Sequence, residues 1–241
     1  MSMMPARNTM LFAILGVFTT VSSAAALTVP FTEEFTTDGA NWRDRAMSPV
    51  TWNSTGGPDG GSYASMSTTF ASNIPGDTVV LFRAQDEFNS SGNAFVGDWI
   101  GSGVRMVTAY VRHDAGAPLS FFARITPPPN FPGAIALQFG PVPSGQWTLI
   151  ALPVLEDGPN LIFEGGDYAS IFGAVGHLQF GTTVPAELAG SATPITFQLD
   201  KPTIRDTSIP TVSEWGLAAM TLGLMSFGTI AIRRKSAART G

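Results

Sequence analysis

The 241-residue chain contains no cysteine, only two histidines, and few charged residues, which make up 13% of the sequence. The absence of cysteine excludes a disulfide framework, a thiol nucleophile and a cysteine-based zinc site. A Ser-His-Asp triad would have to use His113 or His177, and no G-x-S-x-G nucleophile elbow is present. The sequence therefore predicts no catalytic residue.

Positive charge is scarce in the middle of the chain. Residues 27–208 contain 17 Asp and Glu against 8 Lys and Arg, a net charge of −9. Because affinity for nucleic acid is built from Lys and Arg contacts to phosphates, this balance argues against a nucleic-acid partner.

Glycine and proline are abundant, with 26 and 18 residues, and they separate short β-like runs. Ile195, Phe197 and Leu199 alternate with polar residues, as in a half-buried strand. Between residues 27 and 208 we expect no helix beyond a turn at 168–175. Regularly spaced runs with turn residues between them predict an all-β sandwich or jelly roll. The predicted strands are 62–68, 78–84, 104–112, 119–126, 134–139, 146–154, 175–181 and 194–204.

The N-terminus has the pattern of an export signal. Arg7 precedes the apolar run LFAILGVFTTV, and Ala24 and Ala26 match the small-x-small cleavage pattern. We predict a signal peptide over residues 1–26, removed by signal peptidase after Ala26. A retained anchor helix is the alternative, but the run is shorter than the ~20 residues of a membrane span.

The C-terminus carries a second apolar run. Residues 216–232 contain no charge, and Arg233, Arg234 and Lys235 follow directly. Basic residues favour the cytoplasmic side of a membrane span. We therefore predict a transmembrane helix over 216–232, a basic cytoplasmic tail over 233–241, and the acidic domain outside.

The segment IPTVSEWG precedes this run, within a linker and tag that we place at 206–215. Tag, span and arginine cluster together resemble the IPTL-CTERM signals, relatives of the PEP-CTERM signals of exported bacterial proteins. Val212 stands where the family usually has Leu. The matching residues are Ile209, Pro210, Thr211, Ser213, Glu214, Trp215 and Gly216.

The resemblance implies that a membrane-embedded exosortase-type transpeptidase cuts near the tag. The protein would then pass from an inner-membrane intermediate, with its ectodomain outside, to the cell surface or the extracellular matrix. A plain C-terminal anchor that is never cut is the alternative.

The middle of the chain has its own resemblance. GGPDGGSYASM, FVGDW, LSFFARI, SGQWTLIALPV, IFGAVGHLQFG and ITFQLDKPTI follow one another in the order seen in laminin-B-like and carbohydrate-binding-module-like jelly rolls of the galactose-binding-like group. The resemblance covers most of residues 28–205 and implies a jelly-roll ectodomain over 27–205.

Such domains often carry a structural calcium ion that joins the first and last strands. By position, the resemblance implies Glu34 and Asp200 as ligands, with Asp38 or Asp59 and backbone carbonyls as helpers. Oxygen-only ligation suits Ca²⁺. Lys201 offers Asp200 a competing partner, and the spacing of a compact calcium loop is absent.

Sugar faces stack on exposed aromatic rings, so the tryptophans in loops are the candidate ligand-binding residues: Trp42, Trp52 and Trp99. Trp147, in the alternating QWTLIAL run, is predicted to be core. We interpret His113 as a solvated loop residue and His177 as a surface or core-edge residue. The adjacent acids Glu33/Glu34, Asp86/Glu87 and Glu156/Asp157 are interpreted as solvated loop charge.

These features predict an exported, surface-sorted, non-enzymatic β-sandwich protein that binds extracellular polysaccharide or serves in the matrix or envelope. A purely structural surface protein is one alternative. An extracellular glycan hydrolase is another, and it would require two carboxyl groups facing one cleft at ~5 Å or ~6.5–9.5 Å.

Overall fold

The computed structural model describes residues 27–138 and 140–206. The predicted signal peptide, sorting tag, membrane span and basic tail lie outside the described residues. Within the described part of the chain, no helix combines the length and the apolar character that crossing a membrane requires.

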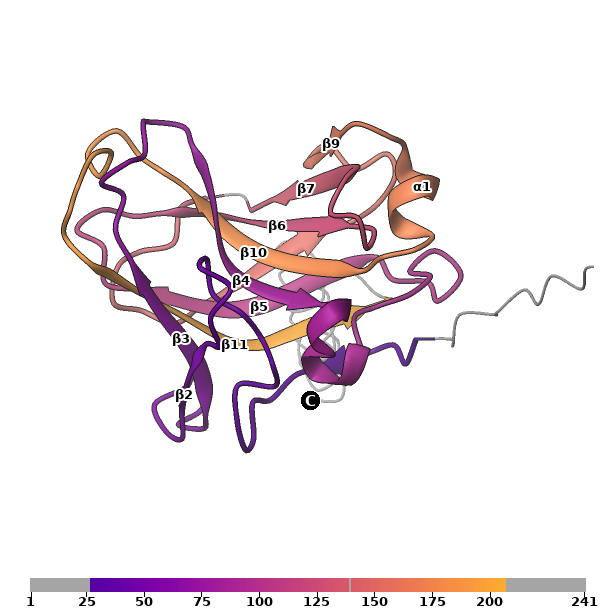
Figure 1. Cartoon of the computed structure of the whole chain (residues 1–241), viewed down its shortest axis with the longest axis horizontal. Coiled ribbons are helices and arrows are strands. Elements are labelled where there is room, and N and C mark those ends of the chain that lie inside the picture. The colour runs from indigo at the N-terminus through magenta and orange to yellow at the C-terminus, as the bar shows by residue number, and fades with distance from the viewer. Residues whose placement is uncertain (1–26, 139, 207–241) are drawn as a thin grey trace, which may run out of the picture.

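The described residues form two antiparallel sheets (Figure 1). Sheet A has the strand order β2-β3-β11-β5-β8, with β1 paired to β11, and sheet B has the order β4-β10-β6-β7-β9. The strands are β1 (Phe31–Thr32), β2 (Thr51–Asn53), β3 (Tyr63–Thr68), β4 (Thr78–Gln85), β5 (Met106–His113), β6 (Ser120–Thr126), β7 (Gly133–Leu137), β8 (Thr148–Pro153), β9 (Leu161–Glu164), β10 (His177–Thr183) and β11 (Ile195–Arg205).

The eight longest strands pair in the order of a jelly roll, with β3-β11-β5-β8 in one layer and β4-β10-β6-β7 in the other. All eight predicted strands are present, and the predicted alternation in β11 is confirmed: Phe197 and Leu199 are buried, while Gln198 between them is partly exposed. The short strands β1, β2 and β9 were not predicted, because two to four residues show no period.

The core lies between the sheets and continues under the loops that close the sandwich. Trp42, which precedes β2, packs edge-to-face against Phe35 and Phe95 and stacks on Phe180 of β10. Loop residues thus complete the aromatic core, which the strands alone do not fill.

One short helix, α1 (Tyr168–Phe172), lies where a turn was predicted. Asp167 caps it, because its Oδ1 accepts the Ser170 N–H at 2.8 Å while the Asp167 N–H donates to Ser170 Oγ at 3.0 Å. This capping box places Tyr168 at the end of the sandwich, beside the loop between β8 and β9. Two 3₁₀ turns, η1 (Asp86–Phe88) and η2 (Ser90–Asn93), follow β4.

Candidate functional site

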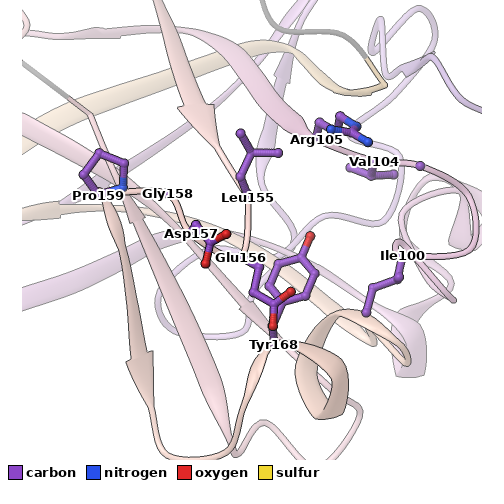
Figure 2. Close-up of a pocket in the computed structure, with 10 residues that line it drawn as sticks. Ile100, Val104, Arg105, Leu155, Glu156, Asp157, Gly158, Pro159 and Tyr168 are labelled. Atoms are coloured by element: carbon purple, nitrogen blue, oxygen red, sulfur yellow. The ribbon is translucent and has the colours of Figure 1, made fainter.

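A pocket of about 520 Å³ opens at the end of the sandwich near α1 (Figure 2), and we call it the end pocket. Its size lies within the usual range for small-ligand sites. Ile100, Val104 and Arg105 form one wall, and the β8–β9 loop, residues 155–159, forms another. The ring of Tyr168 completes the lining.

Tyr168 is held rigidly in this pocket. Its hydroxyl donates to the Val154 carbonyl at 2.9 Å, and its ring stacks on Phe172 with the centroids 4.5 Å apart. Burial raises the pKa of Tyr168, Glu156 raises it further and Arg105 opposes the rise, so the phenol is protonated at neutral pH. The pocket therefore presents a fixed, neutral aromatic ring.

Charged groups converge on the same pocket. Glu156 and Asp157 are exposed and consecutive in the chain, and Arg105 lies across the opening in Figure 2. The two acids are solvated, as predicted, but the fold also assigns them to a concave surface with Tyr168 and Arg105. Sequence reasoning missed Tyr168 and Arg105, because no local pattern distinguishes them.

Two of the three candidate ligand-binding tryptophans were wrongly predicted to be exposed. Trp42 and Trp99 are both 0% exposed. Their indole N–H groups donate to Ser91 Oγ and to the Phe95 carbonyl, each at 2.8 Å. They close the ends of the core, and a sugar ring cannot reach them.

Trp52 is 37% exposed on the edge strand β2, with its indole N–H bonded to the Phe35 carbonyl at 2.6 Å. A ligand contact by Trp52 stays a prediction.

Trp147, predicted to be core, instead lies partly exposed beside the outer face of sheet A. Its indole N–H donates to the Gly56 carbonyl at 2.9 Å, and its ring meets Tyr63 edge-to-face at 5.4 Å. The Arg112 guanidinium lies 4.8 Å from its ring centroid. The alternation of buried and more exposed residues predicted for β8 is present from Leu149 to Pro153. Trp147 precedes this strand, and its ring lies on the solvent-facing side of sheet A.

The residues that the resemblance implied for calcium do meet at one place. Lys201 Nζ lies 2.6 Å from Asp59 Oδ2 and 3.3 Å from Glu34 Oε2, so a side-chain ammonium bridges two of the carboxylates. Asp38 is used elsewhere, because its Oδ1 accepts the Ala40 N–H at 2.7 Å.

Asp200 is 1% exposed, and its Oδ2 has no hydrogen-bond partner among the described residues. A methyl group built on Gly57 would lie 2.9 Å from this oxygen, 3.0 Å from the Gly61 carbonyl oxygen and 3.2 Å from the Ser62 carbonyl oxygen. Burial raises the pKa of Asp200 to about 7, although the Lys201 N–H and ammonium oppose the rise. Asp200 Oδ1 accepts the Lys201 N–H at 2.8 Å, but Oδ2 lacks a partner in the described part of the chain and faces the same space as two carbonyl oxygens, which fits the oxygen-only ligation that Ca²⁺ prefers. Calcium binding stays a prediction.

The two histidines differ from each other. His113, predicted to be solvated, is 1% exposed at the end of β5, with Nε2 3.0 Å from the Val142 carbonyl. That prediction was wrong because the β7–β8 loop, which contains Val142, covers the end of β5.

His177 is also buried, and its Nε2 lies 3.2 Å from Asp86 Oδ1 and 3.0 Å from Glu87 Oε2. Sequence reasoning missed this grouping, since about 90 residues separate the acids from the histidine. Among the described residues, these three form the one His and carboxylate group close enough to hold a metal ion.

The described residues thus define an antiparallel β-sandwich with a ligand-sized pocket at one end. The IPTL-CTERM motif matches residues 207–234, which confirms the resemblance of the tail. No curated protein matches the sequence.

The solved structures similar to the sandwich include carbohydrate-binding modules and a laminin domain, the two kinds of domain that the sequence resembles. The CBM22-1–GH10 modules of Clostridium thermocellum endo-1,4-β-D-xylanase, complexed with xylohexaose, match with a TM-score of 0.45 and 14% identity over 74% of this chain and 28% of the xylanase chain. A family 30 carbohydrate-binding module of a C. thermocellum cellulosomal cellulase gives 0.39 and 10%, over 78% of this chain and 95% of its own. The L4b domain of human laminin alpha-2 gives 0.31 and 10%, over 73% and 96%. At this identity the likeness concerns the fold alone.

Proposed function

We propose that this is an exported, surface-displayed, non-enzymatic protein whose sandwich binds extracellular polysaccharide in the end pocket. The observation that carries the proposal is the lining of that pocket. One face of the Tyr168 ring is stacked on Phe172, and the other face is available to a sugar ring. Glu156 and Asp157 offer acceptors for sugar hydroxyls, and Arg105 offers donors. The tail motif supports delivery to the surface.

The arrangement of the acids supports binding rather than hydrolysis. Glu156 and Asp157 come from one turn and share one wall of the end pocket, whereas a glycosidase uses two carboxyl groups that flank the scissile bond. Asp86 and Glu87 are both engaged with His177. A purely structural role in the matrix is the rival reading, and it predicts no glycan affinity.

The binding test uses the full chain in a mild non-ionic detergent and soluble polysaccharides, namely xylan, mixed-linkage β-glucan and galactan, by affinity electrophoresis and calorimetry. We expect the double variant E156Q/D157N to lose about tenfold in affinity or more, because charge-assisted hydrogen bonds are lost. Y110A, which removes a partly exposed aromatic from the outer face of sheet A, is the control and should bind as the parent does. Equal binding by all three proteins, or release of reducing sugar, would overturn the proposal.

The export test measures the intact mass of the protein recovered from membrane, surface and medium fractions of its host. Loss of residues 1–26 and of the segment beyond Gly216 is the expected result. A mass that retains 216–232 would make the tail a plain anchor and would refute processing by a transpeptidase.

A further inference from the structure

Three arginines stand in one row on the outer face of sheet B. Arg43 and Arg83 form a backbone pair, with N–H to carbonyl distances of 2.9 and 2.8 Å. Gln179 of β10 lies opposite Arg83 on one side and opposite Arg124 of β6 on the other. Directly paired residues of antiparallel strands point to the same face. We call Arg43, Arg83 and Arg124 the arginine row.

The row continues into apolar side chains. Ile135 of β7 is paired with Arg124, and Ile162 of β9 is paired with Ile135. Ile162 is 52% exposed. The sheet face therefore changes from cationic to apolar along one line that crosses the strands.

The three guanidinium groups differ in their partners. Arg124 is fully engaged, because its Nε forms an ion pair with Glu164 Oε2 at 2.5 Å and its terminal nitrogens donate to Asn130 and Gln179. The Arg43 guanidinium lies 4.3 Å from the centroid of the Phe88 ring, and its Nε is buried without a hydrogen bond to any described residue. Within the described part of the chain, the side chain of Arg83 makes no hydrogen bond or ion pair, and its Nε is buried.

The acids whose charges favour the ionised form of Arg83, Asp44 and Glu87, already accept hydrogen bonds from other groups. Asp44 Oδ1 accepts the N–H groups of Ala46 and Ser48, each at 2.8 Å. Glu87 accepts from the Gln85 side-chain amide at 3.1 Å and faces His177. Arg83 therefore has attractive charge at a distance but no counter-ion in contact.

This arrangement costs folding free energy. Like charges directly opposite each other in a sheet are destabilising, and a partly desolvated guanidinium without a partner adds to the cost. Burial lowers the pKa of Arg83, and the charge of Arg124 lowers it further. A bound oxyanion would offset both the repulsion between the arginines and the desolvation of the Arg83 guanidinium. The planar fork of arginine fits a carboxylate with two parallel hydrogen bonds.

We propose that the arginine row binds the carboxylate groups of an acidic polysaccharide, with Arg83 as the principal contact. The apolar end at Ile162, which is 52% exposed, suits the C–H face of a sugar ring, whereas Ile135 is buried. Half of the eight basic residues in 27–208 are Arg43, Arg45, Arg83 and Arg124, and the charges of Arg45 and Arg124 act on Arg83. Positive charge is therefore concentrated around the row, which favours an anionic ligand there. The site lies on sheet B and does not depend on the end pocket.

The test measures binding of the full chain in detergent to polygalacturonate, to the same polymer after methyl esterification, and to dextran sulfate. The variants are R83Q, R83K and the control R205Q. Arg205 is partly exposed on sheet A and, like Arg83, has a buried Nε without a partner, so R205Q changes the net charge equally at a remote place.

We expect the parent to bind polygalacturonate and to lose that binding on esterification. R83Q should lose about tenfold or more, R83K should lose part of the affinity because it keeps the charge without the fork, and R205Q should bind as the parent does. R83Q should also melt no lower than the parent, because it removes like-charge repulsion.

Equal losses in R83Q and R205Q would reduce the effect to overall charge and overturn the proposal. Binding of dextran sulfate without binding of polygalacturonate would overturn the carboxylate assignment. The variant E156Q/D157N should keep its polygalacturonate affinity, so failure of the end-pocket proposal is distinguishable from failure of this one.

Discussion

Lys201 Nζ and Asp59 Oδ2 lie 2.6 Å apart, and this contact joins the last strand to the glycine-rich loop before β3. The contact forms at the irregularity in β11 between Asp200 and Thr203, where Lys201 adopts a φ of 49°. The bulge turns the lysine toward Asp59 and Glu34, while the carboxylate of Asp200 stays buried. The Lys201 ammonium thus pairs with Asp59 and Glu34, whereas the buried Asp200 Oδ2 has no partner among the residues that the structure describes and could accept a second cation.

Calcium should stabilise the protein through that oxygen. We expect millimolar CaCl₂ to raise the melting temperature of the full chain relative to EDTA, because an ion that binds only the folded state adds to its stability. D200N should abolish the response, and D38N, at an acid that caps a turn elsewhere, should preserve it. An unchanged melting temperature of the parent in calcium would refute the site.

Without calcium, stability should depend on pH through Asp200. Its pKa is raised to about 7 from 3.8, so the neutral carboxyl favours folding below pH 4, and that contribution is lost as the pH rises to 7. The loss is at most roughly 4 kcal/mol. Asp59, whose pKa is lowered by its hydrogen bond to Lys201, acts in the opposite direction near and below pH 4.

Urea unfolding in EDTA at pH 4.5, 6 and 7.5 measures the effect of Asp200. D200N, which cannot ionise, should flatten the profile and exceed the parent in stability at pH 7.5. An identical pH profile in parent and variant would show that Asp200 ionises freely in the folded state.

Gly57 is required for the space beside Asp200. In G57A the new methyl group would lie 2.9 Å from Asp200 Oδ2 and within 3.2 Å of two backbone carbonyl oxygens, which cannot move aside easily. We expect a loss of about 1–3 kcal/mol and no calcium response. G116A is the matched control, because an added methyl group there meets nothing within 4 Å, and its stability should stay within about 0.5 kcal/mol of the parent.

Trp42 should act on stability rather than on ligand affinity. W42A empties a site surrounded by Phe35, Phe95 and Phe180, and should cost about 3–5 kcal/mol in urea unfolding. W52A, at a residue 37% exposed on an edge strand, should cost distinctly less. A W42A protein as stable as W52A would contradict the core assignment.

Local pattern carried most of the strand assignment. β11 alternates between buried and partly exposed positions over most of its length, and β4 and β5 do so over part of theirs. β3 begins with four buried residues in a row, and it was recognised as a short β-like run bounded by turn residues. The tail motif was readable for the same reason, because its residues are contiguous and need no fold to be compared.

Side-chain exposure outside the strands could not be read in this way. Trp42 and Trp99 lie in segments rich in glycine and polar residues, which predict loops, but those loops close the sandwich and turn both rings inward. Trp147 sits one residue before an alternating strand, and its face depends on where β8 begins to pair with β5. Burial is a property of the two packed sheets, and a sequence window contains only one strand of them.

The sequence by itself therefore determined the class of fold, the strand positions and the sorting tail, since each rests on short-range periodicity or a contiguous motif. Only the tertiary structure decided which groups meet: Tyr168 with Glu156 and Arg105, Asp200 with the Gly57 loop, and Arg83 between Arg43 and Arg124. Strand register and loop closure bring these residues together from positions 12 to 143 apart in the chain, and no local pattern encodes such pairings.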